Sequence, residues 1–292
     1  MSKKMQGNIM LAIAALIWGT AFVAQRTGMD HIGPLTFTCV RSFVGALALL
    51  PVALLFEKKP ENKAKNKKTL LIGGIACGAC LVFAASFQQI GIQYTTAGKS
   101  GFITALYIVL VPIFSFIFLR KRPAVTVWVS VVIATVGLYL LCITESFSLA
   151  VGDIWLLACA LIFTLHILVI DYFSPKCNGV FLSLIQFVTV GILSGIAMFI
   201  FEQPDINAII SCAGPLLYTG IMSSGVAYTL QILAQEHTEP TVAVLIMSFE
   251  SVFAVIAGWL ILNENLSIKE LIGCLLMFIA VILSQLPRKE KQ

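Results

Sequence analysis

The stretch TVAVLIMSFESVFAVIAGWLILNE, residues 241–264, decides the kind of fold that this chain adopts. From Thr241 to Leu262 it carries one ionisable side chain, Glu250, and so long an apolar run predicts a membrane-spanning helix. At about 1.5 Å per residue, Glu250 lies about 14 Å from its start, near the centre of a hydrocarbon layer about 30 Å thick. A charge at that depth is costly unless it is neutralised, paired or wet, so Glu250 is a functional-site hypothesis. The alternative is a protonated Glu that bonds a neighbouring helix.

The composition extends this prediction to the whole chain. Of its 292 residues, 59% are hydrophobic and 11% are charged, with a mean hydropathy of +0.97, whereas a soluble domain carries about 25% charged residues. The sequence therefore indicates a polytopic protein whose partner is the lipid bilayer. Its net charge of +5 comes from Lys and Arg gathered in short hydrophilic gaps without a basic face, so we expect no nucleic-acid partner.

Apolar segments recur along the chain and predict an all-α integral membrane protein with ten transmembrane helices. The predicted spans are residues 8–24, 35–56, 70–93, 99–119, 124–143, 153–173, 179–201, 213–235, 241–262 and 268–286.

The spans also form a repeat of five. A single offset along the chain superposes the later spans of the two halves and puts Tyr107 on Glu250. We therefore predict two repeats, residues 1–143 and residues 144–292. Because five is odd, the second repeat enters the membrane from the opposite side, which makes an inverted-topology repeat around a central site.

Four short motifs, together with this span order, resemble the EamA branch of the drug/metabolite transporter superfamily. The motifs are Trp18-Gly19 in the first span, Arg41 after Pro34 in the second, the segment 248–254, and Asn263-Glu264 after it. The resemblance implies a bacterial inner-membrane secondary transporter of small organic metabolites such as amino acids, and it favours export. The solute and the direction of transport are left open by the residues themselves.

The chain departs from this family pattern at two places. Ser251 stands where the family often has Pro after the acid, so nothing here predicts a proline kink in the ninth span. Arg120-Lys121 stands where the family often has Gly-Glu at the end of the first hairpin.

Helical spacing selects the polar side chains that would line a central cavity. The expected substrate-contacting residues are Glu250, Tyr107, Gln88, Gln231, Tyr228, Ser224, Thr104 and Trp18. Glu250 would either hold the substrate or couple protons, and Arg41 is its possible charge partner. For each polar side chain, ordinary hydrogen bonding between helices is the competing explanation.

Other classes of function fit the sequence less well. The three histidines, His31, His166 and His237, lie in separate segments without a nucleophile or metal-ligand motif, so we expect no enzyme, metal site or cofactor. The absence of a Gly-rich phosphate loop argues against ATP drive or an ATPase partner. A passive polar-solute channel is the nearest alternative, and an integral membrane enzyme is a more distant one. Nothing in the sequence selects between a monomer and a dimer.

The basic residues predict the orientation of the chain. Fifteen of the nineteen Lys and Arg lie at the termini or in the gaps after even-numbered spans. The opposite face has Arg26, Lys99 and Lys269, and Arg41 lies within the membrane. By the positive-inside rule both termini should be cytoplasmic. In a background without the native cysteines, we expect an impermeant thiol reagent outside cells to label Ser148→Cys and to spare Asn66→Cys. Labelling of Asn66→Cys and not of Ser148→Cys would mean that the chain has the opposite orientation in the membrane.

Overall fold

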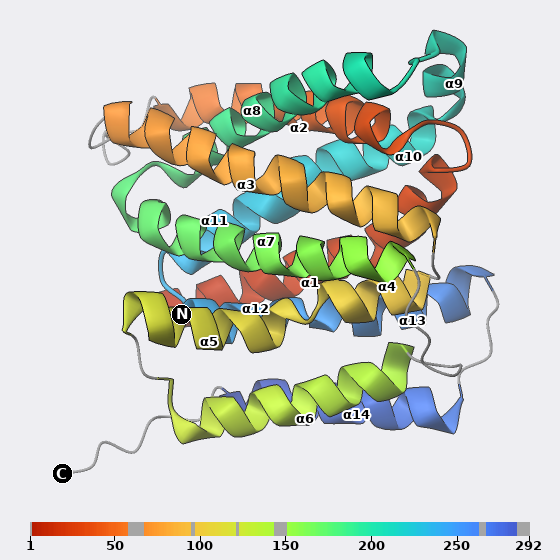
Figure 1. The fold of residues 1–292 in the computed structure, drawn as a ribbon. Helices are drawn as coiled ribbons and strands as arrows, with labels where there is room; N and C mark the ends of the chain where they lie inside the picture. The colour runs from red at the N-terminus through yellow and green to blue at the C-terminus, as the bar shows by residue number, and fades with distance from the viewer. Residues whose placement is uncertain are drawn as a thin grey trace.

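The protein is a bundle of α-helices that lie side by side along one axis (Figure 1). The computed structural model describes residues 2–57, 67–94, 97–120, 123–142, 151–262 and 267–284. No strand occurs in these ranges, which confirms the predicted all-α class. Several predicted features lie outside the described residues, namely Lys121, Asn263-Glu264, the boundary between residues 143 and 144, and the test positions Asn66 and Ser148.

The helices follow the predicted spans closely. In chain order they are α1 Lys3–Gly28, α2 Pro34–Glu57, α3 Lys67–Gln93, α4 Ala97–Thr104, α5 Tyr107–Leu119, α6 Val125–Cys142, α7 Val151–Phe173, η1 Ser174–Lys176, α8 Gly179–Phe201, α9 Ile206–Ser211, α10 Ala213–Tyr218, η2 Thr219–Ala227, α11 Tyr228–Gln235, α12 Pro240–Met247, α13 Phe249–Leu262 and α14 Ile268–Ser284.

Length and composition identify membrane-spanning segments among the described residues. Eight segments are long and apolar enough to cross a membrane, and Val125–Leu140 is a shorter apolar helix. The last predicted span corresponds to α14, which has 17 residues. The chain is thus a multi-pass membrane protein, while the count of ten spans stays a prediction.

Two of the predicted spans are broken near their middle. The span over residues 99–119 is divided into α4 and α5 by Ala105 and Leu106, and the span over 241–262 is divided into α12 and α13 by Ser248. The offset that puts Tyr107 on Glu250 also puts Ala105 on Ser248, so the two breaks correspond. No proline is needed at the second break, where the Ser248 hydroxyl donates to the Leu245 carbonyl at 2.8 Å.

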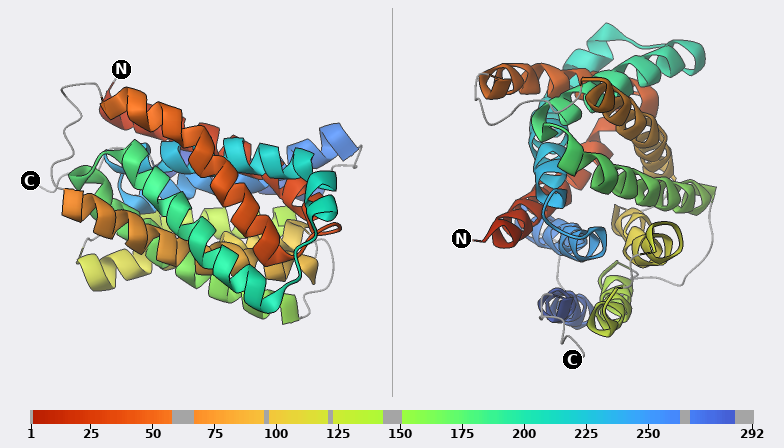
Figure 2. Two further views of the ribbon diagram at one scale, coloured as in Figure 1. Left: turned by 90° about the horizontal axis from the view of Figure 1, so that it is seen from above. Right: turned by 90° about the vertical axis from the view of Figure 1, so that its left-hand side faces the viewer.

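The contacts between helices are matched between the two halves of the chain. α6 packs on α14, and α2 packs on α8. The contact of α3 with α7 has its counterpart in the contact of α1 with α11 and η2. The contact of α3 with α8 has its counterpart in the contact of α2 with η2. Figure 2 shows α6 and α14 together at one edge of the bundle. α1 begins and α14 ends at the same end of the bundle, on the left in Figure 1.

Glu202 joins α2 to α8 at the opposite end of the bundle. Its carboxylate accepts the backbone N–H groups of Leu35 and Thr36 at 2.8 Å each and the Thr36 hydroxyl at 2.6 Å. The first N–H groups of a helix have no partner within it and carry positive partial charge. An acid that follows α8 therefore caps α2.

We expect Glu202→Ala to lower the free energy of unfolding by about 1–2 kcal/mol, since it removes a charged cap from three donors. Thermal unfolding of the purified protein in detergent measures the loss. Glu236→Ala, at an exposed acid just after α11, is the matched control and should change little. Equal losses in both variants would mean that the cap contributes nothing specific.

Candidate functional site: a cavity where the broken helices meet

An internal cavity lies where the two broken spans meet α1, α2, α3, α7 and the η2–α11 segment. The empty space between its lining atoms is about 500 Å³, its open side included. It brings together seven of the eight predicted contact residues, and Arg41 with them. The lining residues are Trp18, Phe22, Gln25, Arg41, Gln88, Thr104, Tyr107, Phe163, Ile167, Ser223, Tyr228, Gln231, Met247 and Glu250.

A hydrogen bond between the two broken spans forms the centre of the site. The Tyr107 hydroxyl donates to Glu250 Oε1 at 2.9 Å, and both side chains are buried. Tyr107 begins α5, and Glu250 lies in the first turn of α13, so each follows directly on a helix break. The two residues that the repeat superposes are therefore bonded to each other.

Gly19 allows α13 to approach α1 closely at Glu250. A Cβ atom on Gly19 would lie 2.5 Å from the Glu250 carbonyl oxygen and 2.7 Å from Phe253 Cβ, distances that real contacts do not reach. The neighbouring Trp18 packs edge-on against the Tyr228 ring, with 4.8 Å between ring centroids. The Trp18-Gly19 pair thus sets both the depth of α13 and one wall of the cavity.

Arg41 shares the cavity with Glu250 but has another partner. Its Nη1 donates to Gln25 Oε1 at 3.0 Å, and its guanidinium carbon lies 5.7 Å from the centroid of the Phe37 ring. Across the described ranges no ion pair joins Arg41 to Glu250, so the suggested direct pairing is not made in this conformation. Sequence reasoning missed Gln25, although its spacing of seven residues from Trp18 places both on one face of α1.

Ser224 is the predicted contact residue that the cavity does not include. Residues 219–227 form a π-helix, in which the Tyr228 N–H bonds to the Ser223 carbonyl, five residues back. This register puts Ser223 in the cavity wall, whereas Ser224 faces α2, where a Cβ atom on Gly45 would lie 2.7 Å from Ser224 Cβ. The α-helical spacing of four from Tyr228 pointed to Ser224 and was one residue off.

Two further buried polar pairs surround the site. His166 Nε2 lies 2.9 Å from Gln186 Oε1, away from the cavity lining. Gln231 donates through Nε2 to Gln235 Oε1 at 3.0 Å, and Gln235 in turn donates to the Ile167 carbonyl at 3.1 Å. His166 is thus a bonded interior residue, and Gln235 orients Gln231 from behind.

Three polar atoms of the cavity wall have no hydrogen-bond partner among the described residues. They are the donor Trp18 Nε1, the hydroxyl Thr104 Oγ1 and the acceptor Gln231 Oε1. Thr104 faces the buried thiol of Cys159, which is a weak partner at most. Leaving such a group unsatisfied costs about 1–3 kcal/mol. Together with the Glu250 carboxylate and the Arg41 guanidinium, these atoms offer hydrogen bonds to a polar molecule in the cavity.

The fold and this cavity define a class of protein, the helical multi-pass membrane protein with a polar cavity in its interior. A solved structure titled "Crystal structure of protein" has the same fold, with a TM-score of 0.79 and 16% identity over 96% of each chain. An "Uncharacterized transporter" from Archaeoglobus fulgidus is 33% identical over 97% of this chain and 87% of its own. The "Uncharacterized transporter YoaV" of Bacillus subtilis is 24% identical over 95% of this chain and 96% of its own.

The family model for the EamA-like transporter family matches the chain twice, over residues 5–143 and 150–286. The chain therefore belongs to the EamA-like transporter family, as the Trp18-Gly19, Arg41 and 248–254 motifs suggested. Its relatives are named as transporters rather than as enzymes. Within the described residues no three His, Cys, Asp or Glu side chains come together in a way that would hold a metal ion.

The register of the π-helix can be tested by enlarging its two serines. Ser224→Leu should lower the free energy of unfolding by about 1–3 kcal/mol, because the added side chain meets α2 at Gly45. Ser223→Leu is the matched change and should cost less, because its side chain enters the cavity. Thermal unfolding in detergent compares the two, and the reverse order would indicate a regular α-helical register.

Proposed function

We propose that this protein is a secondary transporter that carries small organic metabolites bearing a cationic amino group, such as amino acids, by alternating access. The observation that carries the proposal is the Tyr107–Glu250 hydrogen bond, inside a cavity and at the breaks of two spans. Discontinuous helices near mid-membrane are typical of substrate sites in secondary transporters, because their free ends offer polar backbone groups.

The arrangement of charges in the cavity supports a solute with both an amine and a carboxylate. Glu250 accepts one hydrogen bond from Tyr107 and retains capacity for a cationic donor. Arg41 offers further donors beyond its bond to Gln25 and suits a carboxylate. Trp18, Phe163 and Tyr228 supply aromatic walls for an apolar side chain.

Two observations favour an inverted repeat, with residues 1–143 and 144–292 as its halves. The family model matches once in each half, and the helix contacts of one half have counterparts in the other. With ten spans, the halves would have opposite orientations, and exchange of their conformations would expose the central cavity to each side in turn. We further propose that the chain lies in a bacterial inner membrane with both termini cytoplasmic, that it exports its solute, and that an ion gradient drives it.

A thermal-shift screen of the purified protein against amino acids, polyamines, nucleosides and sugars tests the solute class. A ligand that binds the folded state alone raises the temperature of unfolding. Counterflow in proteoliposomes, with a mixture of radiolabelled amino acids as probe, then separates a carrier from a channel. Saturable uptake driven by unlabelled amino acids inside is expected, and flux that neither saturates nor shows counterflow would favour the passive channel.

Glu250→Gln tests the role of the acid while keeping its size and its bond to Tyr107. If Glu250 holds the amine, binding and equal-pH exchange should both fall at least tenfold, since a charged hydrogen bond contributes about 1.5–3 kcal/mol. Loss of pH-driven accumulation with normal exchange would assign the acid to proton coupling alone. Unchanged transport and pH dependence would leave Glu250 as a structural contact between helices.

A further inference from the structure

Three buried hydroxyl groups lie on α4 and α13 near Glu250, those of Ser100, Thr104 and Ser251, and we call them the seam. Ser100 and Thr104 lie one helical turn apart on α4, and Ser251 follows Glu250 on α13. Ser251 faces α4, because a Cβ atom on Gly101 would lie 3.9 Å from Ser251 Oγ. All three side chains are at most 3% exposed. The hydroxyls of Ser100 and Ser251 have no hydrogen-bond partner among the described residues, and Thr104 has at most the weak partner that the Cys159 thiol offers.

Unpartnered buried hydroxyls are unusual, because native interiors satisfy nearly all such groups with protein or ordered water. Hydroxyl groups both donate and accept, so a row of them can hold a file of water molecules. The seam therefore has the chemistry of a wet path. Thr104 also lines the cavity, so the seam begins at the solute site.

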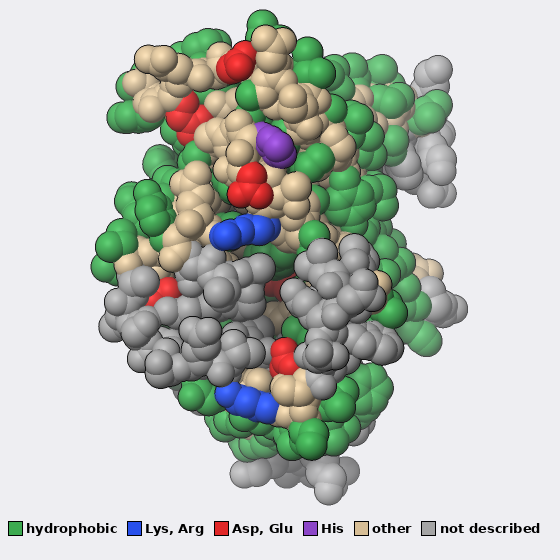
Figure 3. Space-filling model, turned by 90° about the vertical axis from the view of Figure 1, so that its right-hand side faces the viewer, with side chains coloured by type: hydrophobic (Ala, Val, Ile, Leu, Met, Phe, Trp, Pro, Cys, Tyr) green, Lys and Arg blue, Asp and Glu red, His purple; other side chains and the backbone are tan. Residues whose placement is uncertain are grey.

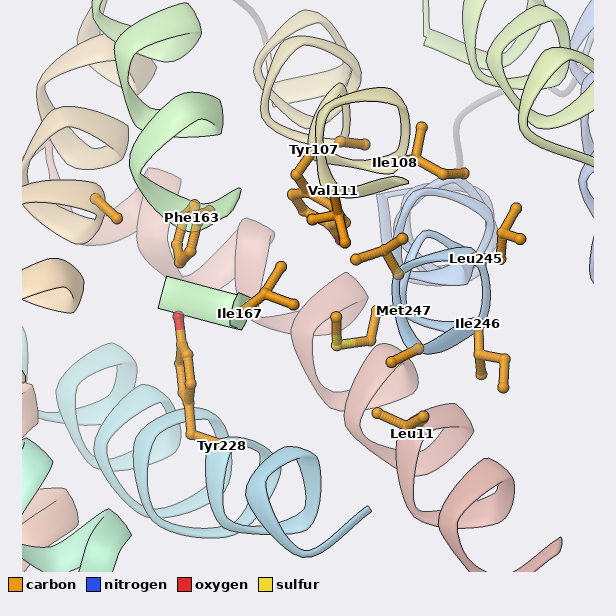
Figure 4. Packing of buried hydrophobic residues seen from close by; sticks show 14 of the residues in the cluster. Leu11, Tyr107, Ile108, Val111, Phe163, Ile167, Tyr228, Leu245, Ile246 and Met247 are labelled. Carbon is orange, nitrogen blue, oxygen red and sulfur yellow. The ribbon is translucent and has the colours of Figure 1, made fainter. Parts of the chain in front are cut away.

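The corresponding interface of the other broken halves, α5 against α12, is apolar. Ile108 and Val111 on α5, Leu245 and Met247 on α12 and Leu11 on α1 belong to one buried apolar cluster (Figure 4), and α5 contacts α12. These side chains are at most 2% exposed. The repeat offset puts Ser100 on Ala243, Thr104 on Met247 and Ser251 on Ile108, so each hydroxyl has an apolar counterpart. The two halves of the molecule differ here in chemistry although they match in shape.

The seam leads toward the end of the bundle where α4 begins and α13 ends, on the right in Figure 1. Figure 3 looks at this end and shows acidic, basic and histidine side chains on its surface. The basic gaps and termini predict that this end faces away from the cytoplasm. The apolar contacts of α5 and α12 lie on the cytoplasmic side of Glu250 in that orientation.

We propose that the seam of Ser100, Thr104 and Ser251 is a water-filled proton path that connects Glu250 to the outer face, while the α5–α12 contact seals the inner face. The proposal rests on the proposed transport function and adds the route of its coupling ion. Once an exported solute has left, a proton from outside reaches the vacated carboxylate through the seam and binds its oxygen. When the site has opened to the cytoplasm, the amine of the next solute binds the carboxylate and the proton leaves to the cytoplasm. Proton entry is thereby exchanged for solute exit, with one carboxylate serving both.

Among the residues that line the cavity, Glu250 is the carboxylic acid to which such a path would deliver a proton. The charged or titratable groups that line its cavity are Tyr107, which is bonded to it, Tyr228 on α11 and Arg41 on α2. Cys159 is buried on α7 near Thr104. From α1 and α4 the lining contributes Trp18, Phe22, Gln25 and Thr104, which do not titrate.

Thiol accessibility tests the path without any knowledge of the solute. In a chain whose eight native cysteines are replaced, Ser100→Cys and Ser251→Cys place thiols on the seam, and Ala243→Cys and Ile108→Cys are their matched controls on α12 and α5. A cationic methanethiosulfonate reagent applied outside should label the seam thiols at least tenfold faster than the controls. Equal rates at all four positions would overturn the proposal.

Removal of the hydroxyls tests the proton role. The double variant Ser100→Ala, Ser251→Ala should lose at least fivefold of pH-driven uptake of the radiolabelled amino-acid mixture, and it should keep equal-pH exchange within twofold. Driven uptake at the parent rate, or an equal fall in both measurements, would overturn the path. If the parent itself transports nothing, the proposed function fails, and the labelling rates still decide whether the seam is wet.

Discussion

Burial of one carboxylate inside a hydrocarbon layer is the constraint on which the rest of this structure depends. A charge at that depth is tolerated only with a partner, with water, or as the neutral acid. Here Tyr107 supplies a donor at 2.9 Å from the corresponding position of the other half of the chain. The acid therefore ties the two broken spans together and keeps the centre of the bundle polar.

That arrangement is possible only because helices approach each other closely around it. Gly19 admits the backbone of α13 at Glu250, and Gly45 admits the η2 segment at Ser224. Burial of apolar side chains adds little to helix association in lipid, because lipid chains are as apolar as Leu. Close packing of helices at small residues stabilises the association instead. The glycines of α1 and α2 thus determine where the acid and its cavity lie.

Much of the fold could be predicted because apolar run length is a direct physical requirement of the bilayer. The Tyr107–Glu250 relation also followed from the sequence, since one constant offset between the halves superposed the two positions. Ser223 could not be found in this way. The π-helix adds one residue to the turn that precedes Tyr228, and the spacing of polar residues in the sequence does not reveal that addition. The hydrogen bond from Arg41 to Gln25 was missed for another reason. From the sequence, a buried Arg is expected to pair with an acidic side chain before it pairs with an amide.

The difference between the two halves matters as much as their likeness. Ala105 and Ser248 break their spans at corresponding points, so the backbone of each half has the same freedom to bend there. The side chains near the breaks differ in chemistry, because the repeat offset puts the hydroxyl residues Ser100, Thr104 and Ser251 on the apolar residues Ala243, Met247 and Ile108. A molecule with matched breaks and unmatched linings can expose one site to two faces and still treat them differently. In a carrier the ion gradient sets the net direction of transport, and such an asymmetry determines how readily the coupling ion reaches the site from each face.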